Sequence, residues 1–224
     1  MSVYMTEEEQ LDLIKKWWRR NGTLITLALS LIIFAVAGYR YLTWHQDKLT
    51  QQASVAYEQM MLAVSNHNEN IVKSYANQLI QEHEKTVYAD VAHMTLAKVY
   101  VSENKLENAQ NELKIVADKS KMLSLRQIAK IRIARILLAE KSYTNALNEL
   151  SSIVDATYLP VINELKGDIY GATGQYQEAM NSYKQAITEV KTNGMGNSFL
   201  EMKTNEIAEK NQSLNSDDKK VQST

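Results

Sequence analysis

Cysteine is absent from this 224-residue chain, which contains one proline and seven glycines. The absence of cysteine excludes a disulfide framework, a catalytic thiol and a thiolate metal site. The scarcity of proline and glycine removes the residues that most often interrupt helices. Valine, isoleucine and threonine do not alternate with polar residues over any long stretch, which disfavours β-sheet. The composition therefore predicts an all-α protein.

Charge of one sign is not in surplus, since 25 basic residues face 26 acidic ones. A balanced chain gives no reason to expect a nucleic-acid partner. The four histidines lack a zinc-binding spacing, and we expect His93 to pack inside a helix. A nucleophile elbow and a glycine-rich phosphate loop are missing from the sequence as well. We therefore expect a binding protein without cofactor or metal, not an enzyme.

One long apolar run, from Asn21 to Tyr39, carries no charge. As a helix it would span roughly 28 Å, close to the thickness of the bilayer hydrocarbon. Four basic residues precede it closely and aromatic residues lie at both ends: Lys15, Lys16, Arg19 and Arg20, with Trp17, Trp18, Tyr39, Tyr41 and Trp44. The positive-inside rule keeps such an N-terminus in the cytoplasm. We predict a membrane-spanning helix over residues 21–42, with Phe34 at its apolar centre, and export of the rest.

Two other interpretations of this run exist. Ala35-Val36-Ala37 resembles the cleavage site of a signal peptide, and the helix could instead lie in a soluble core. Before the run, Thr6 and Glu9 fit a capping box, which predicts an amphipathic cytoplasmic helix in residues 1–20. We expect Asn21-Gly22 to turn the chain from that helix into the bilayer. The alternative to a membrane-bound amphipathic helix is a short, solvent-exposed helix that contacts no partner.

A spacing pattern then occurs three times, beginning at Ala97, Ala134 and Gly167. From each start, apolar, turn-forming and small residues follow at successive steps of 3, 4, 2, 3, 4 and 3 residues. This spacing predicts pairs of helices joined by tight turns, with alanine where the second helix crosses the first. Such a pair cannot bury its apolar face alone, so the pairs must stack into a solenoid. The segment 47–84, broken by Asn66-His67-Asn68, matches this spacing poorly, and we interpret it as a degenerate repeat or a cap.

The third copy, Gly167-x-x-Tyr170-x-x-x-Gly174-x-Tyr176-x-x-Ala179-x-x-x-Tyr183-x-x-Ala186, resembles a tetratricopeptide repeat. It departs from that pattern at Asn163 and Lys166, where the repeat favours Trp and Leu. The whole chain also resembles the bacterial YfgM family. The matching residues are Glu8-Glu9-Gln10, Trp17-Trp18-x-x-Asn21-Gly22, Gly38-Tyr39-Arg40-Tyr41 and Leu165-Lys166-Gly167-Asp168.

The YfgM resemblance implies an ancillary subunit of the SecYEG translocon in the bacterial inner membrane. It also implies a membrane-anchored periplasmic peptidyl-prolyl isomerase and exported polypeptides as partners. Residues 43–191 would then form a periplasmic tetratricopeptide-like domain. From the residues themselves we expect a C-terminal helix in residues 192–210 and a polar, disordered tail in residues 211–224. The function it implies is a scaffold that helps exported proteins pass to periplasmic chaperones. A holdase that binds unfolded chains directly, and an envelope or cell-division scaffold, are the alternatives.

The repeat phase predicts a partner-binding strip on the concave side, which this repeat class forms from its first helices. The strip is apolar with isolated charges: Val91, Met94, Lys98, Val101, Ile128, Ile131, Arg135, Leu138, Val161, Glu164 and Asp168. A clamp for a terminal carboxylate needs several Lys, Arg and Asn side chains, and only Lys98 and Arg135 are present on this strip. The same residues could instead form core under the helix at 199–210, and the sequence leaves both interpretations open.

Overall fold

The computed structural model describes residues 7–192 and 198–221. These residues are helical almost throughout and contain no strand, which confirms the all-α prediction. The predicted capping box includes Thr6, which lies outside the described residues. The chain divides into two compact units, Met1–Gln52 and Ala53–Thr224. The packed domain therefore begins about ten residues later than the predicted boundary at residue 43.

Helix α1 (Glu7–Ser65) supplies the predicted membrane-spanning segment. Its apolar side chains are exposed, with 78% of the Phe34 surface accessible, and the helix is long and apolar enough to cross a membrane. Tyr39 is exposed and Asn21 half-buried. The polar side chains inside the run are satisfied locally, since Thr26 donates to the Gly22 carbonyl at 2.9 Å and Ser30 to the Thr26 carbonyl. Local pairing of this kind suits a hydrocarbon environment.

The turn predicted at Asn21-Gly22 is wrong, because α1 continues through it without a break. Asn and Gly each cost about 1 kcal/mol or less in a helix interior, so they do not by themselves end a helix. Gly22 also leaves room for a neighbour: a Cβ there would lie 3.2 Å from Nε1 of Trp18. The glycine thus accommodates an indole ring on the helix surface.

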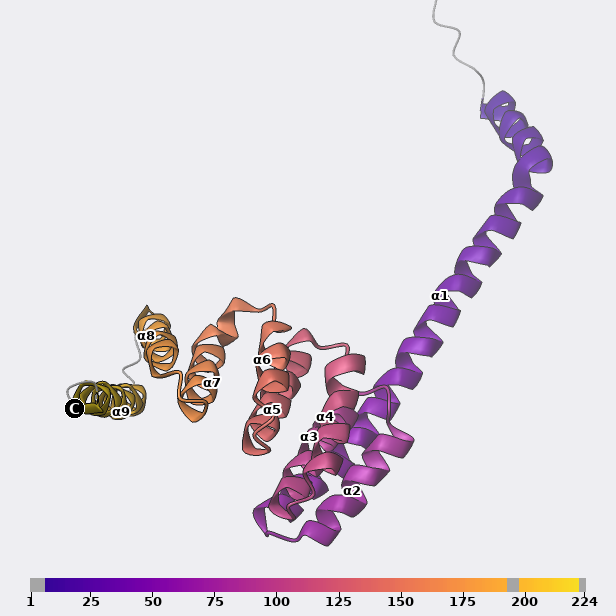
Figure 1. Ribbon diagram of the computed structural model, residues 1–224. Helices are drawn as coiled ribbons and strands as arrows, with labels where there is room; N and C mark the ends of the chain where they lie inside the picture. Colours follow the sequence, from indigo (N-terminus) through magenta and orange to yellow (C-terminus); the bar gives the residue numbers. More distant parts are fainter. Residues whose placement is uncertain (1–6, 193–197, 222–224) are drawn as a thin grey trace, which may run out of the picture. The chain divides into compact units, whose positions relative to one another are not determined.

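In residues 53–192 the chain forms four helical pairs, which follow one another in sequence order (Figure 1). The first pair consists of the end of α1 and α2, whose residues share one buried cluster with α3. The remaining helices pack against their sequence neighbours, as a solenoid requires. Their bounds are α2 Glu69–Glu82, α3 Val87–Ser102, α4 Leu106–Lys119, α5 Leu123–Ala139, α6 Tyr143–Ser151, the short 3-10 helix η1 Ala156–Tyr158, α7 Leu159–Ala172 and α8 Tyr176–Thr192.

The turns inside these pairs adopt one conformation. The residue at the turn position has positive φ in every pair: 59° at Asn104, 60° at Lys141, 77° at Gly174 and 54° at His67. Three of these residues are not glycine, so the left-handed conformation persists where it is disfavoured by side-chain sterics. His67 lies 37 residues before Asn104 in the sequence, the same step that separates Asn104 from Lys141. The N-terminal pair is therefore a repeat in full register, although its residues hide the pattern.

The packing of two residues, which lie sixteen positions apart in every pair, explains why the N-terminal repeat is hard to recognise in the sequence. A Cβ added to Gly167 on α7 would lie 2.5 Å from the ring of Tyr183 on α8, so the glycine exists to admit the tyrosine. The equivalent positions hold Ala97 with Leu113, Ala134 with Leu150, and Met60 with Ala76, each pair within one buried cluster. A small residue on one helix is thus matched with a larger one on the other, and the small residue is on the first helix in every pair except that of Met60 and Ala76. Close packing requires the sum of their volumes to stay nearly constant.

Helix α9 (Ser198–Val221) follows the last pair and packs on α8. Leu200 is fully buried, and a Cβ at Gly171 of α7 would lie 3.0 Å from Cδ1 of Ile207. The helix predicted over 199–210 is present, but it does not end at Lys210. It continues to Val221, so residues 211–221 are not the disordered tail that we expected, and residues 222–224 lie outside the described residues. The segment contains no proline or glycine to end the helix.

We predict that Gly167→Ala destabilises the chain by ~1–3 kcal/mol, because the added methyl group overpacks against the Tyr183 ring. In a Tyr183→Leu background the same change recreates the Ala–Leu pairing of the two preceding repeats. There it should cost little, since alanine is a better helix former than glycine. Thermal unfolding of the detergent-solubilised chain, followed by circular dichroism, compares the stabilities of the wild type, the two single variants and the double variant. An equal cost of Gly167→Ala in both backgrounds would contradict the size-pairing rule.

Candidate partner-binding site

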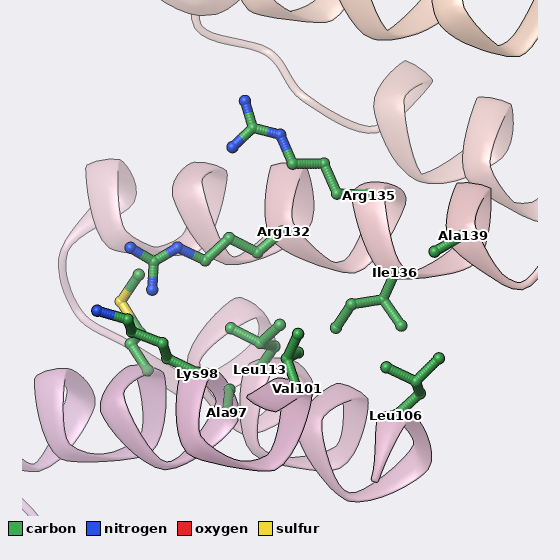
Figure 2. A pocket seen from close by; sticks show the side chains of 10 residues that line it. Ala97, Lys98, Val101, Leu106, Leu113, Arg132, Arg135, Ile136 and Ala139 are labelled. Atoms are coloured by element: carbon green, nitrogen blue, oxygen red, sulfur yellow. The ribbon is translucent and has the colours of Figure 1, made fainter. Parts of the chain in front are cut away.

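An open pocket of about 300 Å³ lies between α3, α4 and α5 (Figure 2). Its interior is apolar and its edge is basic. The lining residues are Met94, Ala97, Lys98 and Val101 of α3, Leu106 and Leu113 of α4, and Arg132, Arg135, Ile136 and Ala139 of α5. The pocket thus belongs to two successive repeats, because α3 and α4 form one pair and α5 begins the next.

Helical periodicity explains why these side chains meet. On α3 the lining residues follow the spacing i, i+3, i+4, i+7 from Met94 to Val101, which places them on one face. On α5 the same spacing runs from Arg132 to Ala139. The two faces approach each other over α4, and the small side chains of Ala97 and Ala139 leave space between them. Val101 keeps 45% of its surface exposed, so the pocket opens to solvent.

The charges at this pocket are all positive. Figure 2 shows the ammonium group of Lys98 and the guanidinium of Arg132 at the same end of the pocket, while Arg135 extends from α5 away from α3. Burial, followed by the positive charge of Arg135, lowers the pKa of Arg132. Among the residues that the structure describes, none of these three cations has an acidic partner within salt-bridge distance. The pocket therefore presents an uncompensated positive potential beside apolar surface.

The predicted strip does not form a single surface. Met94, Lys98, Val101 and Arg135 line the pocket. The apolar members of the remainder are packed into the repeat cores: Val91 against the first cluster, Ile128 against the second, and Ile131, Leu138 and Val161 in the third. Of the two interpretations that the sequence left open, groove or core, core describes these five side chains, because they pack wholly or partly into the clusters between successive helices.

Glu164 and Asp168 were predicted to face a partner protein, but in the structure they pair with a lysine of α9. Nζ of Lys203 on α9 donates to Oε1 of Glu164 at 2.9 Å and to Oδ1 of Asp168 at 2.7 Å. The Tyr183 hydroxyl donates to the same Asp168 oxygen at 2.7 Å. Burial by itself would lower the pKa of Lys203, but the hydrogen bonds to the two carboxylates outweigh it and raise the pKa. Helix α9 thus covers the carboxylates of the last repeat, while the pocket between α3 and α5 stays open.

The predicted strip contained four of the ten lining residues and missed the other six: Ala97, Leu106, Leu113, Arg132, Ile136 and Ala139. One signal was available for Arg132, which lies three residues before Arg135 and hence on the same helix face. Leu106 and Leu113 of α4 lie on the repeat spacing that begins at Ala97, and in the structure they also line the pocket.

The buried histidine of α3 has a structural role. Nδ1 of His93 lies 2.6 Å from Oε2 of Glu112 on α4, which joins the two helices of the second pair. This packed position is the one expected from the sequence. Within the described residues no group of three His, Asp or Glu side chains is placed to hold a metal ion.

The repeat geometry agrees with a comparison to known families. A model described as a tetratricopeptide repeat-like domain matches residues 15–209. The chain belongs to this tetratricopeptide repeat-like family. The match extends from within α1 through all four pairs into α9. The departures at Asn163 and Lys166 are therefore tolerated; buried Asn163 donates from Nδ2 to Oε1 of Glu189 on α8 at 3.3 Å.

Individual relatives within this tetratricopeptide repeat-like family are similar over most of their length. A Neisseria gonorrhoeae protein is 26% identical over 92% of this chain and 100% of its own. One from Aggregatibacter actinomycetemcomitans is 27% identical over 83% and 91%, and one from Escherichia coli K12 is 25% identical over 93% and 100%. Each is named an ancillary SecYEG translocon subunit. These names confirm the resemblance to the YfgM family. No solved structure matches the chain.

We predict that Lys203→Met loosens α9, because Glu164 and Asp168 would then be left side by side without a cation. The loss should be ~1–2 kcal/mol for these partly buried groups. Hydrogen exchange of the α9 amides measures it, with Lys210→Met as the control, since Lys210 pairs only with Glu206 at the surface. Equal exchange rates in the two variants would show that apolar contacts alone hold α9.

We also predict how this docking depends on pH. The pKa of Lys203 is raised in the folded chain, so its contribution is fully present below the ordinary lysine pKa and is lost as the pH rises through the raised value. Exchange of α9 amides, corrected for the intrinsic rate, should therefore stay constant from neutral to mildly alkaline pH and increase only at strongly alkaline pH. An increase already near neutral pH would contradict this assignment.

Proposed function

We propose that this chain is a membrane-anchored protein-binding scaffold associated with the SecYEG translocon. The N-terminus lies in the cytoplasm, α1 crosses the inner membrane, and the repeats lie in the periplasm. There the repeat domain binds proteins that act on exported polypeptides and helps those polypeptides pass to periplasmic chaperones. A membrane-anchored peptidyl-prolyl isomerase is one such partner.

One observation carries this proposal: an open apolar pocket and a candidate membrane-spanning helix occur in the same chain. A solenoid binds partner segments along the surface that its stacked helices form. An anchor confines that surface near the membrane and raises its effective concentration for a neighbouring complex. The relatives named as translocon subunits match this chain across both anchor and repeats, which supports the translocon as the neighbour.

A second candidate is a holdase that binds unfolded exported chains directly. The exposed Val101 and the apolar floor of the pocket favour it, because unfolded chains present apolar segments. The two functions differ in what is bound: a scaffold captures a few folded partners, and a holdase captures many nascent chains. An envelope or cell-division scaffold would use the same fold but capture proteins unrelated to export.

We predict that a photo-crosslinking amino acid at Val101 captures translocon subunits or proteins bound to them in intact membranes. Ile115 on α4 is the matched control, because it is exposed but does not line the pocket. Mass spectrometry of the adducts distinguishes the candidates: a small set of membrane or folded partners supports the scaffold, and a broad set of exported chains supports the holdase. Identical adducts at Val101 and Ile115 would show that the pocket is not the binding surface.

We predict the topology from the four basic residues before the apolar run. A reporter active only in the cytoplasm should work when fused before Ser2 and fail when fused after Thr224. Deletion of residues 1–46 should release the domain from the membrane and weaken capture at Val101, because proximity is lost. Cytoplasmic activity of the Thr224 fusion would reverse the proposed orientation.

A further inference from the structure

The pocket between α3, α4 and α5 combines an apolar interior with cations that the rest of the domain leaves unpaired. Two half-buried lysines of the described chain have acidic partners: Lys73 pairs with Glu103, and Lys203 with Glu164 and Asp168. Lys98 and Arg132 are exposed and point to the same end of the pocket (Figure 2). Among the described residues no acidic group lies within salt-bridge distance of either side chain, so both charges are available to a ligand that enters the pocket.

The physical properties of the pocket restrict that ligand. A cation beside apolar surface interacts more strongly with an anion than it would in open water, because the local dielectric constant is lower. The planar guanidinium of Arg132 can donate two hydrogen bonds to one carboxylate, and the ammonium of Lys98 can approach the same group. A basic segment would be repelled. A purely apolar segment would leave the cations without compensation.

We propose that this pocket binds a peptide segment of a partner protein in which bulky apolar side chains are flanked by acidic ones. This inference rests on the proposed scaffold function and names the chemistry of its ligand. The apolar side chain enters between Met94, Val101 and Ile136, above Leu113. A neighbouring carboxylate meets Lys98 and Arg132 at the edge of the pocket.

The shape of the pocket favours a peptide over a lipid. Its volume of about 300 Å³ lies at the lower end of the range of ligand pockets, roughly 300–1,000 Å³. It is an open recess between helix faces, not a long closed channel for acyl chains. Lys98 and Arg132 come from different repeats, but their charged groups lie at the same end of the recess, beside its apolar lining (Figure 2). A peptide places its apolar and acidic groups on successive side chains, which suits such an arrangement.

Three fluorescein-labelled peptides test the inference on the full chain in detergent. The first is Gly-Ser-Glu-Leu-Phe-Leu-Glu-Ser-Gly, the second has lysine in place of both glutamates, and the third keeps the glutamates but has serine in place of Leu-Phe-Leu. We expect fluorescence anisotropy to show the first peptide binding about tenfold more tightly than either of the others. Its affinity should fall as salt is added, because the cations lie at the pocket edge.

Charge reversal provides the decisive comparison. Lys98→Glu combined with Arg132→Glu should exchange the preference, so that the lysine peptide binds more tightly than the glutamate peptide. The matched control is Lys184→Glu on α8, which is exposed and does not line the pocket. Circular dichroism checks that the variants remain helical. Because Lys98 is exposed, Lys98→Gln should stay folded in any case, and it should weaken binding of the glutamate peptide severalfold.

Three results would overturn the inference. One is equal binding of all three peptides, and another is a preference that the charge reversal leaves unchanged. The third is displacement of the glutamate peptide by phosphatidylglycerol vesicles in a manner that depends on Lys98, which would make a lipid headgroup the ligand. The scaffold proposal has a separate readout, namely translocon subunits crosslinked at Val101. Its success together with charge-insensitive peptide binding would reject only the inference about ligand chemistry.

Discussion

The close approach of two helices within each pair is the constraint on which the rest of this structure depends. The approach is set by one contact, between a residue on the first helix and the residue sixteen positions later on the second. Gly167 admits Tyr183 because no Cβ fits at 2.5 Å from the ring, whereas Met60 faces the small Ala76. The same two positions thus hold different combinations of small and large residues in the four pairs. Because the interior is close-packed, an error at this contact would change the spacing of the next pair as well.

The same contact builds the binding pocket. Ala97 and Leu113 close the second pair, and both also line the pocket between α3, α4 and α5. A small residue on α3 keeps that helix near α4, and Leu113 then provides an apolar floor on which α5 does not fully rest. The pocket is therefore a consequence of how two repeats meet, which explains why it lies between pairs and not inside one. Binding there would remove apolar area from water, worth ~25 cal/mol per Å² before ordering costs.

Local features of the fold could be predicted from the sequence. Features that depend on which other helix covers a side chain could not. The offsets from Ala97, Ala134 and Gly167 reflect contacts within one pair, so they place helices and turns well. Whether a side chain such as Ile131 is exposed depends instead on the next pair, which the repeat phase does not describe. Glu164 and Asp168 look free in sequence because their partner, Lys203, lies 35 or more residues away on a helix of unrelated pattern. The first repeat was obscured because its size pair is reversed, with methionine on the first helix.

Charge is distributed along the solenoid in a way that separates folding from recognition. At the C-terminal end, α9 contributes a cation, Lys203, that pairs with two carboxylates of the last repeat, so these charges are engaged within the fold. In the middle, Lys98 and Arg132 are held by helix geometry and not by ion pairs, so their positions do not depend on an internal acid. A cation that the fold does not need for its own stability can be neutralised by a partner without loosening the domain. Attached to a membrane anchor, such a surface acts at high effective concentration, so modest affinity is sufficient for capture. Under the proposed ligand chemistry, selectivity comes from the sign of the charge beside the apolar contact and requires no change in the solenoid itself.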